Sequence, residues 1–173
     1  GYAADEAVRI LREAGVENAL LNLGGNVITI GGNPDGRPWR IGLQDPRTEE
    51  TGEPHFAIIG VADATIVSSG DYERYLEKVY EETRERYHHI LDPKTGFPAQ
   101  KGLMTCTIIT NSSIDADALS TILFIMGREE GFQLMEELGN VEAIAVTLDK
   151  EIYTTEGLKG SLININEHYR VMD

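Results

Sequence analysis

The sequence predicts an α+β fold in which helices pack on one face of a largely antiparallel sheet. Three observations support this class. Predicted strands outnumber predicted helices, most strands are joined by turns, and the helical patterns are confined to one segment at the start and two in the second half. With 173 residues and 41% hydrophobic content, the chain can bury one sizeable core. We therefore expect residues 1–173 to form a single domain.

Three segments carry the helical patterns. Residues 2–14 have apolar side chains at helical spacing and end at Gly15, a common helix stop. Residues 113–126 and 128–138 predict two further helices that Gly127 separates.

The predicted strands are rich in Val, Ile, Leu and Thr and are bounded by Gly, Pro, Asn or Asp. Residues 18–30 predict two short strands with a bulge or kink at Gly24-Gly25. The charged run 81–86 predicts a solvated loop or a strand edge. The remaining predicted strands are residues 39–43, 56–61, 65–69, 87–91, 103–110, 141–148 and 152–155, with a last pair at 162–165 and 169–172.

The net charge of −14 argues against nucleic acid and anionic membranes as partners, because both would be repelled. An anionic nucleotide would need a divalent cation to offset the repulsion. The longest apolar helical run, residues 122–126, is far too short to span a membrane, and no signal peptide or lipobox is visible. The single cysteine, Cys106, lies in an apolar run and predicts a buried strand thiol.

Asp117 and Thr121 stand four residues apart on the predicted helix 113–126, which places them on one face. A carboxylate and a hydroxyl in this arrangement form an oxygen-only site suited to magnesium. Asp115 is explained by the helix start, where acidic residues offset the helix dipole. Helix capping and solvation are the alternative explanation for Asp117 as well.

His88 and His89 precede an Asp-Pro turn at residues 92–96. Adjacent residues of a strand point to opposite faces, so one histidine can face a pocket. A neutral histidine can act as a general base near pH 7. For either residue alone, packing or a cross-strand hydrogen bond is the alternative.

Two further stretches carry weaker signals. Residues 21–26 contain Gly24-Gly25 but lack the endings of a P-loop or a dinucleotide fingerprint. Residues 65–74 place Ser68 and Ser69 at a strand end without a nucleophile elbow, so a turn is the default interpretation. No cysteine and histidine cluster has zinc spacing.

Taken together, six stretches resemble the ApbE family, the FAD:protein FMN transferases. They stand in the family's order and run through about two-thirds of the chain. They are Gly1-Tyr-Ala-Ala-Asp5, Asn22-Leu-Gly-Gly-Asn26, residues 39–47, Ser68-Ser-Gly-Asp-Tyr-Glu-Arg74, His89-Ile-Leu-Asp-Pro-Lys-Thr-Gly96 and Asp115-Ala-Asp-Ala-Leu-Ser-Thr121.

The resemblance implies a T-fold-like architecture and a magnesium-dependent reaction. Such enzymes cleave FAD, attach FMN to a Thr or Ser hydroxyl of an acceptor protein and release AMP. Carried over by motif, Asp117 and Thr121 are the expected Mg²⁺ ligands and His89 the expected catalytic histidine. Leu91 is expected to lie against the bound flavin nucleotide. Family members are often exported or membrane-anchored lipoproteins.

The family's domain has an N-terminal portion that carries much of the FAD pocket and precedes the stretch matching Gly1–Asp5. The resemblance therefore implies that this chain lacks that portion. Either a missing N-terminal segment or second chain supplies it, or the chain is a processed fragment. Two alternatives to the transferase stay open. One is a magnesium-dependent FAD pyrophosphatase that yields FMN and AMP, and the other is a non-catalytic flavin-binding fragment.

Overall fold

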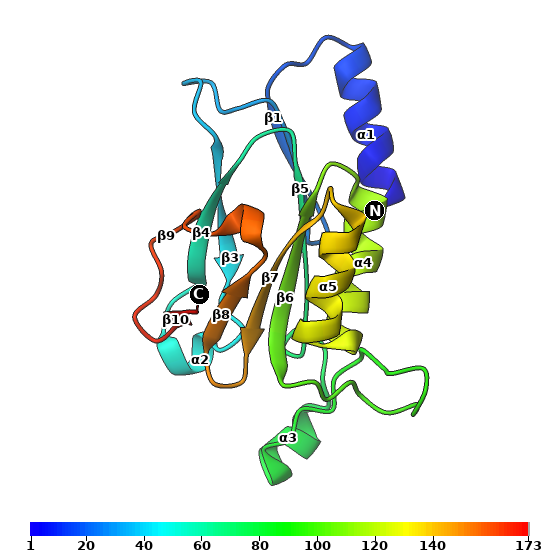
Figure 1. Ribbon diagram of the computed structural model, residues 1–173, viewed down its shortest axis with the longest axis vertical. Coiled ribbons are helices and arrows are strands. Elements are labelled where there is room, and N and C mark those ends of the chain that lie inside the picture. The colour runs from blue at the N-terminus through cyan, green and yellow to red at the C-terminus, as the bar shows by residue number, and fades with distance from the viewer. Residues whose placement is uncertain (173) are drawn as a thin grey trace.

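The computed structural model describes residues 1–172 as three layers, with helices, a large sheet and a small sheet stacked in that order (Figure 1). The large sheet has seven strands in the order β1-β2-β5-β6-β7-β8-β10, and the small sheet has the order β3-β4-β9. All strand pairs are antiparallel except β8 with β10. The predicted α+β class with a largely antiparallel sheet is confirmed.

The helices are α1 (Tyr2–Glu13), α2 (Thr48–Thr51), α3 (Glu77–Thr83), α4 (Ser113–Met126) and α5 (Arg128–Leu138), with a 3₁₀ turn at Glu156–Leu158. The strands are β1 (Ala19–Leu23), β2 (Asn26–Ile30), β3 (Trp39–Gln44), β4 (His55–Val61), β5 (Thr65–Gly70), β6 (Leu103–Thr110), β7 (Glu142–Thr147), β8 (Glu151–Thr154), β9 (Leu162–Ile163) and β10 (Arg170–Val171). None of these helices has the length and apolar character needed to cross a bilayer.

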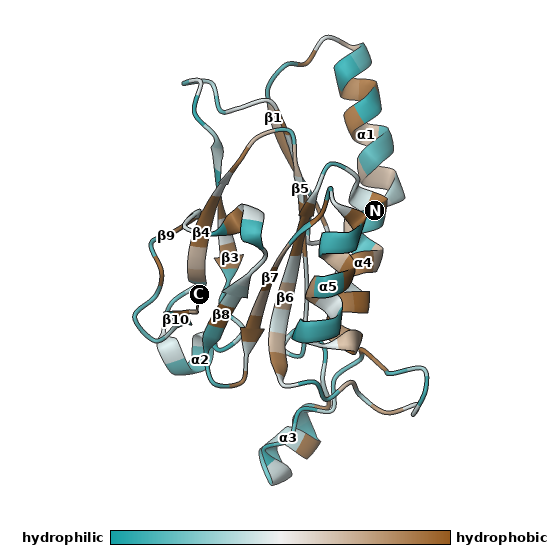
Figure 2. Ribbon diagram, viewed as in Figure 1, coloured by the Kyte–Doolittle hydropathy of each residue, from teal (hydrophilic) through white to brown (hydrophobic). Residues whose placement is uncertain are grey.

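The centre of the large sheet is buried on both faces, and its strands β5 and β7 appear largely brown in Figure 2. Along β7, Ala143 and Ala145 face α4 and α5, whereas Ile144 and Val146 face the small sheet. This alternation follows from the two-residue period of a strand. Small residues on the helix side let α4 and α5 approach closely, and larger ones fill the space between the two sheets.

The segment from β1 to β2 is a hairpin, so the predicted bulge at Gly24-Gly25 is wrong. Leu23 pairs with Asn26, which leaves the two glycines as the whole turn. Their φ angles are 64° and 97°. Two-residue hairpin turns commonly require positive φ at both positions, and glycine adopts it without steric cost.

Residues 77–91 differ from the prediction. The charged run lies partly in α3, and the strand expected at 87–91 is replaced by two isolated bridges, Tyr75 with His88 and Leu91 with Pro98. Glu and Lys are good helix formers, and the Arg86 guanidinium lies over the ring of Tyr80. These contacts favour a short helix, which projects from the bottom of the molecule in Figure 1.

The chain also forms two sheets where the sequence predicted one. β4 and β5 are consecutive but lie in different sheets, and residues 62–64 cross between the layers. The last two strands do not pair with each other, because β9 joins β4 and β10 joins β8.

Candidate functional site

A cavity of about 790 Å³ opens between the two sheets and the N-terminal half of α4. This volume is in the range of small-molecule sites, about 300–1,000 Å³. Its lining combines the β1–β2 hairpin, strands β3 and β5, the segment after β5 and α4. The lining residues used below are Asn22, Gly24, Gly25, Gly42, Gln44, Thr48, Ser68, Ser69, Tyr72, Glu73, Arg74, His89, Asp117 and Thr121.

Asp117 and Thr121 both line this cavity, as their spacing on one helix face predicts. The Asp117 side chain is 53% exposed, so an ion can reach it. The Thr121 hydroxyl lies 3.4 Å from that of Ser69, which in turn lies 2.8 Å from the Ser120 hydroxyl. The Ser69 hydroxyl at the end of β5 therefore contacts both Thr121 and Ser120 of α4.

The donor set at this place fits magnesium, because carboxylate and hydroxyl oxygens are the hard ligands that the ion prefers. In residues 1–172 no three His, Cys, Asp or Glu side chains are grouped to hold a metal. Mg²⁺ usually keeps several waters and takes substrate phosphates as ligands, so two protein ligands suffice. The Gly1 nitrogen donates to Asp117 Oδ2 at 2.9 Å. A cation at Asp117 would share or displace that contact.

Asp5 supports the start of α4, a role that the spacing of the sequence does not reveal. Its two carboxylate oxygens accept the backbone N–H groups of Ser113 at 2.8 Å and Ile114 at 2.9 Å. Ser112 caps the same helix by accepting the Asp115 N–H at 3.3 Å. The first residues of α4 are therefore fixed from α1 as well as from their own turn.

Gly1 lies directly against this helix start. A Cβ at Gly1 would come within 2.5 Å of the Ile114 Cα, so only glycine allows this approach. Both ends of the stretch from Gly1 to Asp5 therefore contact α4. These contacts explain the glycine and the aspartate at these positions, which local sequence patterns do not.

His89 lines the cavity and is exposed. Its backbone N–H donates to the Arg74 carbonyl at 3.1 Å, and its ring Nδ1 lies 3.2 Å from the same oxygen. A carbonyl only accepts, so Nδ1 carries the proton of the neutral ring. The lone pair is then on Nε2, where a general base needs it.

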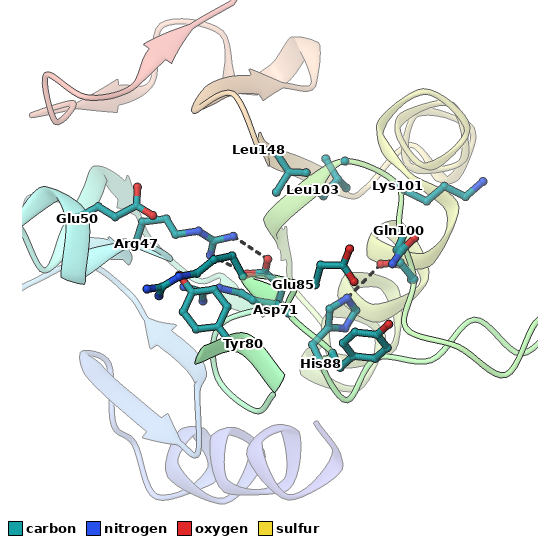
Figure 3. A pocket seen from close by; sticks show the side chains of 15 residues that line it. Arg47, Glu50, Asp71, Tyr80, Glu85, His88, Gln100, Lys101, Leu103 and Leu148 are labelled. Atoms are coloured by element: carbon teal, nitrogen blue, oxygen red, sulfur yellow. Dashed lines mark hydrogen bonds and ion pairs between the residues drawn. The ribbon is translucent and has the colours of Figure 1, made fainter. Parts of the chain in front are cut away.

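His88 points the other way, as expected for adjacent residues although the predicted strand is not formed. It is 6% exposed and lines a second cavity of about 470 Å³ (Figure 3). Its Nε2 lies 3.1 Å from the Ala99 carbonyl oxygen, and its ring meets Phe124 edge-on at 5.4 Å. Burial lowers the pKa of His88, so the neutral form is favoured.

Leu91 lies two residues beyond His89 at the base of the turn 92–96. Its side chain is 51% exposed, and its backbone forms a bridge with Pro98. It does not belong to the described lining of the larger cavity.

The two weaker sequence signals also meet in this cavity. Gly24 and Gly25 form one part of the lining, with the Asn22 side chain accepting the Gly25 N–H at 3.1 Å. Ser68 and Ser69 form another part, at the end of β5. Each stretch is an ordinary turn or strand end by itself, and the fold places both of them opposite α4.

Charge in the cavity is mixed. Arg74 is a basic lining residue, while Glu73 and Asp117 are acidic. Burial raises the pKa of Tyr72 to about 12, so its hydroxyl remains a proton donor at neutral pH. An anionic ligand would therefore meet carboxylates as well as donors.

The chain is similar to members of one family both in sequence and in structure. The family model described as the ApbE family matches residues 1–145. A FAD:protein FMN transferase of Klebsiella pneumoniae (strain 342) is 36% identical over 176 residues, covering 100% of this chain and 51% of the relative. One of Treponema pallidum (strain Nichols) is 34% identical and covers 91% of this chain and 44% of the relative.

Solved structures show the same likeness. The ApbE protein of Thermotoga maritima superimposes with a TM-score of 0.78 at 34% identity, covering 93% of this chain and 50% of that one. The flavin transferase ApbE of Vibrio cholerae gives 0.75 at 29% identity, with 91% and 48% covered. This chain spans about half the length of the relatives it matches. Its match to the family model over most of its length shows that it belongs to the ApbE family.

Proposed function

We propose that the protein containing this chain is an FAD:protein FMN transferase. It would cleave the pyrophosphate of FAD with the help of Mg²⁺, attach FMN to a Thr or Ser hydroxyl of an acceptor protein and release AMP. The observation that carries the proposal is the meeting of Asp117, Thr121 and His89 in one cavity. His89 lies 28 positions before Asp117 in the sequence, so the fold brings them together. Two relatives named FAD:protein FMN transferase support the assignment.

In this proposal Asp117 and Thr121 hold magnesium through their side-chain oxygens. When bound, the ion offsets the charge of the pyrophosphate and of the departing AMP phosphate. The strongly acidic chain makes that compensation necessary, since its net charge of −14 repels phosphate. Ser69, which also bonds to Ser120, holds the Thr121 hydroxyl at the cavity.

His89 is the proposed general base. Its Nε2 accepts the proton of the acceptor hydroxyl while that oxygen forms a bond to the phosphorus of the FMN half. The bond from this phosphorus to the bridging oxygen breaks, and AMP leaves with the bonding electrons. Arg74 fixes the ring through its carbonyl so that Nε2 is free for this task.

Leu91 is a proposed contact of the flavin nucleotide. Its side chain is half exposed and therefore accessible to a ligand. An apolar side chain next to an aromatic flavin would bury surface from water on both sides.

A second candidate is an FAD pyrophosphatase. His89 is exposed, so water reaches the same base as readily as an acceptor hydroxyl. The metal and histidine roles would be unchanged and the products would be free FMN and AMP.

The test combines the complete protein with FAD, MgCl₂ and a candidate acceptor that contains a Thr or Ser site. Intact-mass measurement should show an acceptor heavier by one FMN, together with released AMP. Free FMN with unmodified acceptor would select the pyrophosphatase. Absence of AMP release with every acceptor and with water would contradict both activities.

Two variants connect the activity to the site. Asp117→Ala should abolish magnesium-dependent turnover, whereas Asp115→Ala, an exposed carboxylate two residues away, should not. His89→Ala should lower kcat more than it raises KM for FAD, because the base acts in the chemical step. A fully active Asp117→Ala enzyme would defeat the assignment of that residue.

A further inference from the structure

A buried ion pair, Arg47 with Asp71, forms part of the lining of the smaller cavity. The Arg47 guanidinium donates to both oxygens of Asp71, at 2.8 and 2.7 Å, and both side chains are 8% exposed (Figure 3). Two parallel bonds from a planar guanidinium fix the orientation of the carboxylate as well as its position. Neither residue belongs to the lining of the larger cavity that contains His89.

Arg47 is itself held firmly. Its backbone N–H donates to Asp45 at 2.7 Å, and its guanidinium donates to the Pro46 carbonyl at 2.8 Å. It follows β3 of the small sheet, whereas Asp71 follows β5 of the large sheet. The pair therefore joins the two sheets at one end of the larger cavity, whose opposite walls come from these same strands.

Asp71 begins the segment that reaches His89. The three residues after it, Tyr72 to Arg74, line the larger cavity and have no regular secondary structure. The segment is anchored at its start by Asp71, whose N–H also donates to the Met104 carbonyl at 3.0 Å. At its end, the Arg74 carbonyl receives the N–H and the ring Nδ1 of His89.

We propose that Arg47 and Asp71 form a positioning pair that holds the Arg74 carbonyl against His89 and so keeps the imidazole proton on Nδ1. Neither residue of the pair lines the larger cavity that holds His89, Asp117 and Thr121. Its part in turnover rests on the proposed transferase function, whereas its effect on the imidazole can be measured without any activity.

The chemistry of buried ion pairs suggests how to separate positioning from stability. Removing one partner leaves an unpaired buried charge and destabilises the fold, whereas replacing both by apolar residues of similar size is often neutral. Arg47→Met with Asp71→Leu keeps the volume filled and removes the two directional bonds. The segment 72–74 then loses its side-chain anchor, while the bond from the residue 71 N–H to the Met104 carbonyl and the core packing remain.

The experiment compares the complete wild-type protein with this double variant and with Arg47→Lys, which keeps the charge but loses the paired geometry. The imidazole nitrogen signals of His89 are measured by NMR, and a His89→Gln protein identifies them. In the wild type we expect a single Nδ1–H form. In both variants we expect a mixture with the Nε2–H form that a free imidazole favours in water.

Steady-state kinetics supply the second measurement. We expect kcat to fall about 10-fold or more, because small displacements of a catalytic group have large effects on rate. KM for FAD should stay within about threefold, since neither residue lines the larger cavity. Lys150→Met is the control, because it breaks the ion pair between Lys150 and Glu50 of α2, the helix that Arg47 directly precedes. It should change neither measurement.

A folded variant in which His89 keeps the pure Nδ1–H form would overturn the proposal. If the double variant does not fold, Arg47→Lys alone decides by the same criterion. A wild-type protein without transferase or pyrophosphatase activity would refute the proposed function, while the imidazole signals would still test the positioning pair.

Discussion

Replacing Asp5 should destabilise the start of α4. Its carboxylate accepts the N–H groups of Ser113 and Ile114, two of the four that a helix N-terminus leaves without intrahelical partners. Ser113 is fully buried, so its N–H has no access to water once the carboxylate is gone. Asp5→Ala therefore removes two charge-assisted bonds and leaves one buried donor unpaired.

The magnitude follows from these contacts. Loss of an N-terminal cap costs about 0.5–2 kcal/mol, and an unsatisfied buried donor costs about 1–3 kcal/mol. Asp5 is partly exposed, which favours the lower part of each range. We expect Asp5→Ala to reduce the free energy of unfolding by about 2 kcal/mol in urea titration. Asp5→Asn should lose about half as much, because its amide oxygen still accepts one N–H.

Glu6→Ala is the matched control on the same helix. Glu6 pairs with Arg9, which also binds Glu13, so one ion pair remains after the change. We expect no change that the same titration resolves. If Asp5→Ala unfolds at the wild-type urea concentration, or if Glu6→Ala is equally destabilising, the cap does not stabilise α4 as reasoned.

Two further predictions concern buried groups. Burial lowers the pKa of His88 below its usual 6.5, so as the pH falls the unfolded state binds a proton at a higher pH than the folded state does. The free energy of unfolding of the wild type should fall as the pH drops from about 6.5 through the lower folded pKa. In urea titrations, His88→Gln should lose less of this free energy between pH 7 and 5 than the wild type. Equal losses would contradict the reasoning. Burial also raises the pKa of Cys106, whose Sγ lies 3.1 Å from the Ser120 carbonyl oxygen. Thiol reagents should label it only after unfolding, and rapid labelling of the native protein would show that β6 opens.

The three long helices, α1, α4 and α5, were predictable because their signals are local. Ser112 caps α4, Gly127 separates it from α5, and Gly139 follows α5 in a left-handed conformation. Each signal acts within one turn of the residues it affects. The same locality explains why the sequence alone places Asp117 and Thr121 on one face of the helix.

Sheet membership was not predictable for a physical reason. A turn at Ala62-Asp63 looks the same whether the next strand pairs with β4 or crosses to another sheet. The choice depends on apolar side chains from strands distant in sequence, such as Phe56 and Ile144, which pack between the sheets. No spacing along the chain records that partnership.

The prediction for residues 71–91 was wrong for a related reason. Their conformation depends on Arg47, 24 positions away from Asp71, and on two bridges between non-neighbouring residues. His89 lines the larger cavity and His88 the smaller one, and in the sequence only the motif distinguishes His89 from His88. The tautomer of His89 depends on the Arg74 carbonyl, which no residue pattern specifies.

The cap at Asp5 also bears on where phosphate can bind. The N-terminus of a helix is ordinarily a favourable place for an anion, because its N–H groups and dipole attract negative charge. In α4 the N–H groups of Ser113 and Ile114 already bind a carboxylate of this chain. A pyrophosphate in the cavity would therefore meet the flank of α4, where Asp117 repels it unless a cation lies between them. Because Asp5 occupies these two N–H groups, the proposed magnesium at Asp117 and Thr121 would supply positive charge that the start of α4 does not offer to a phosphate.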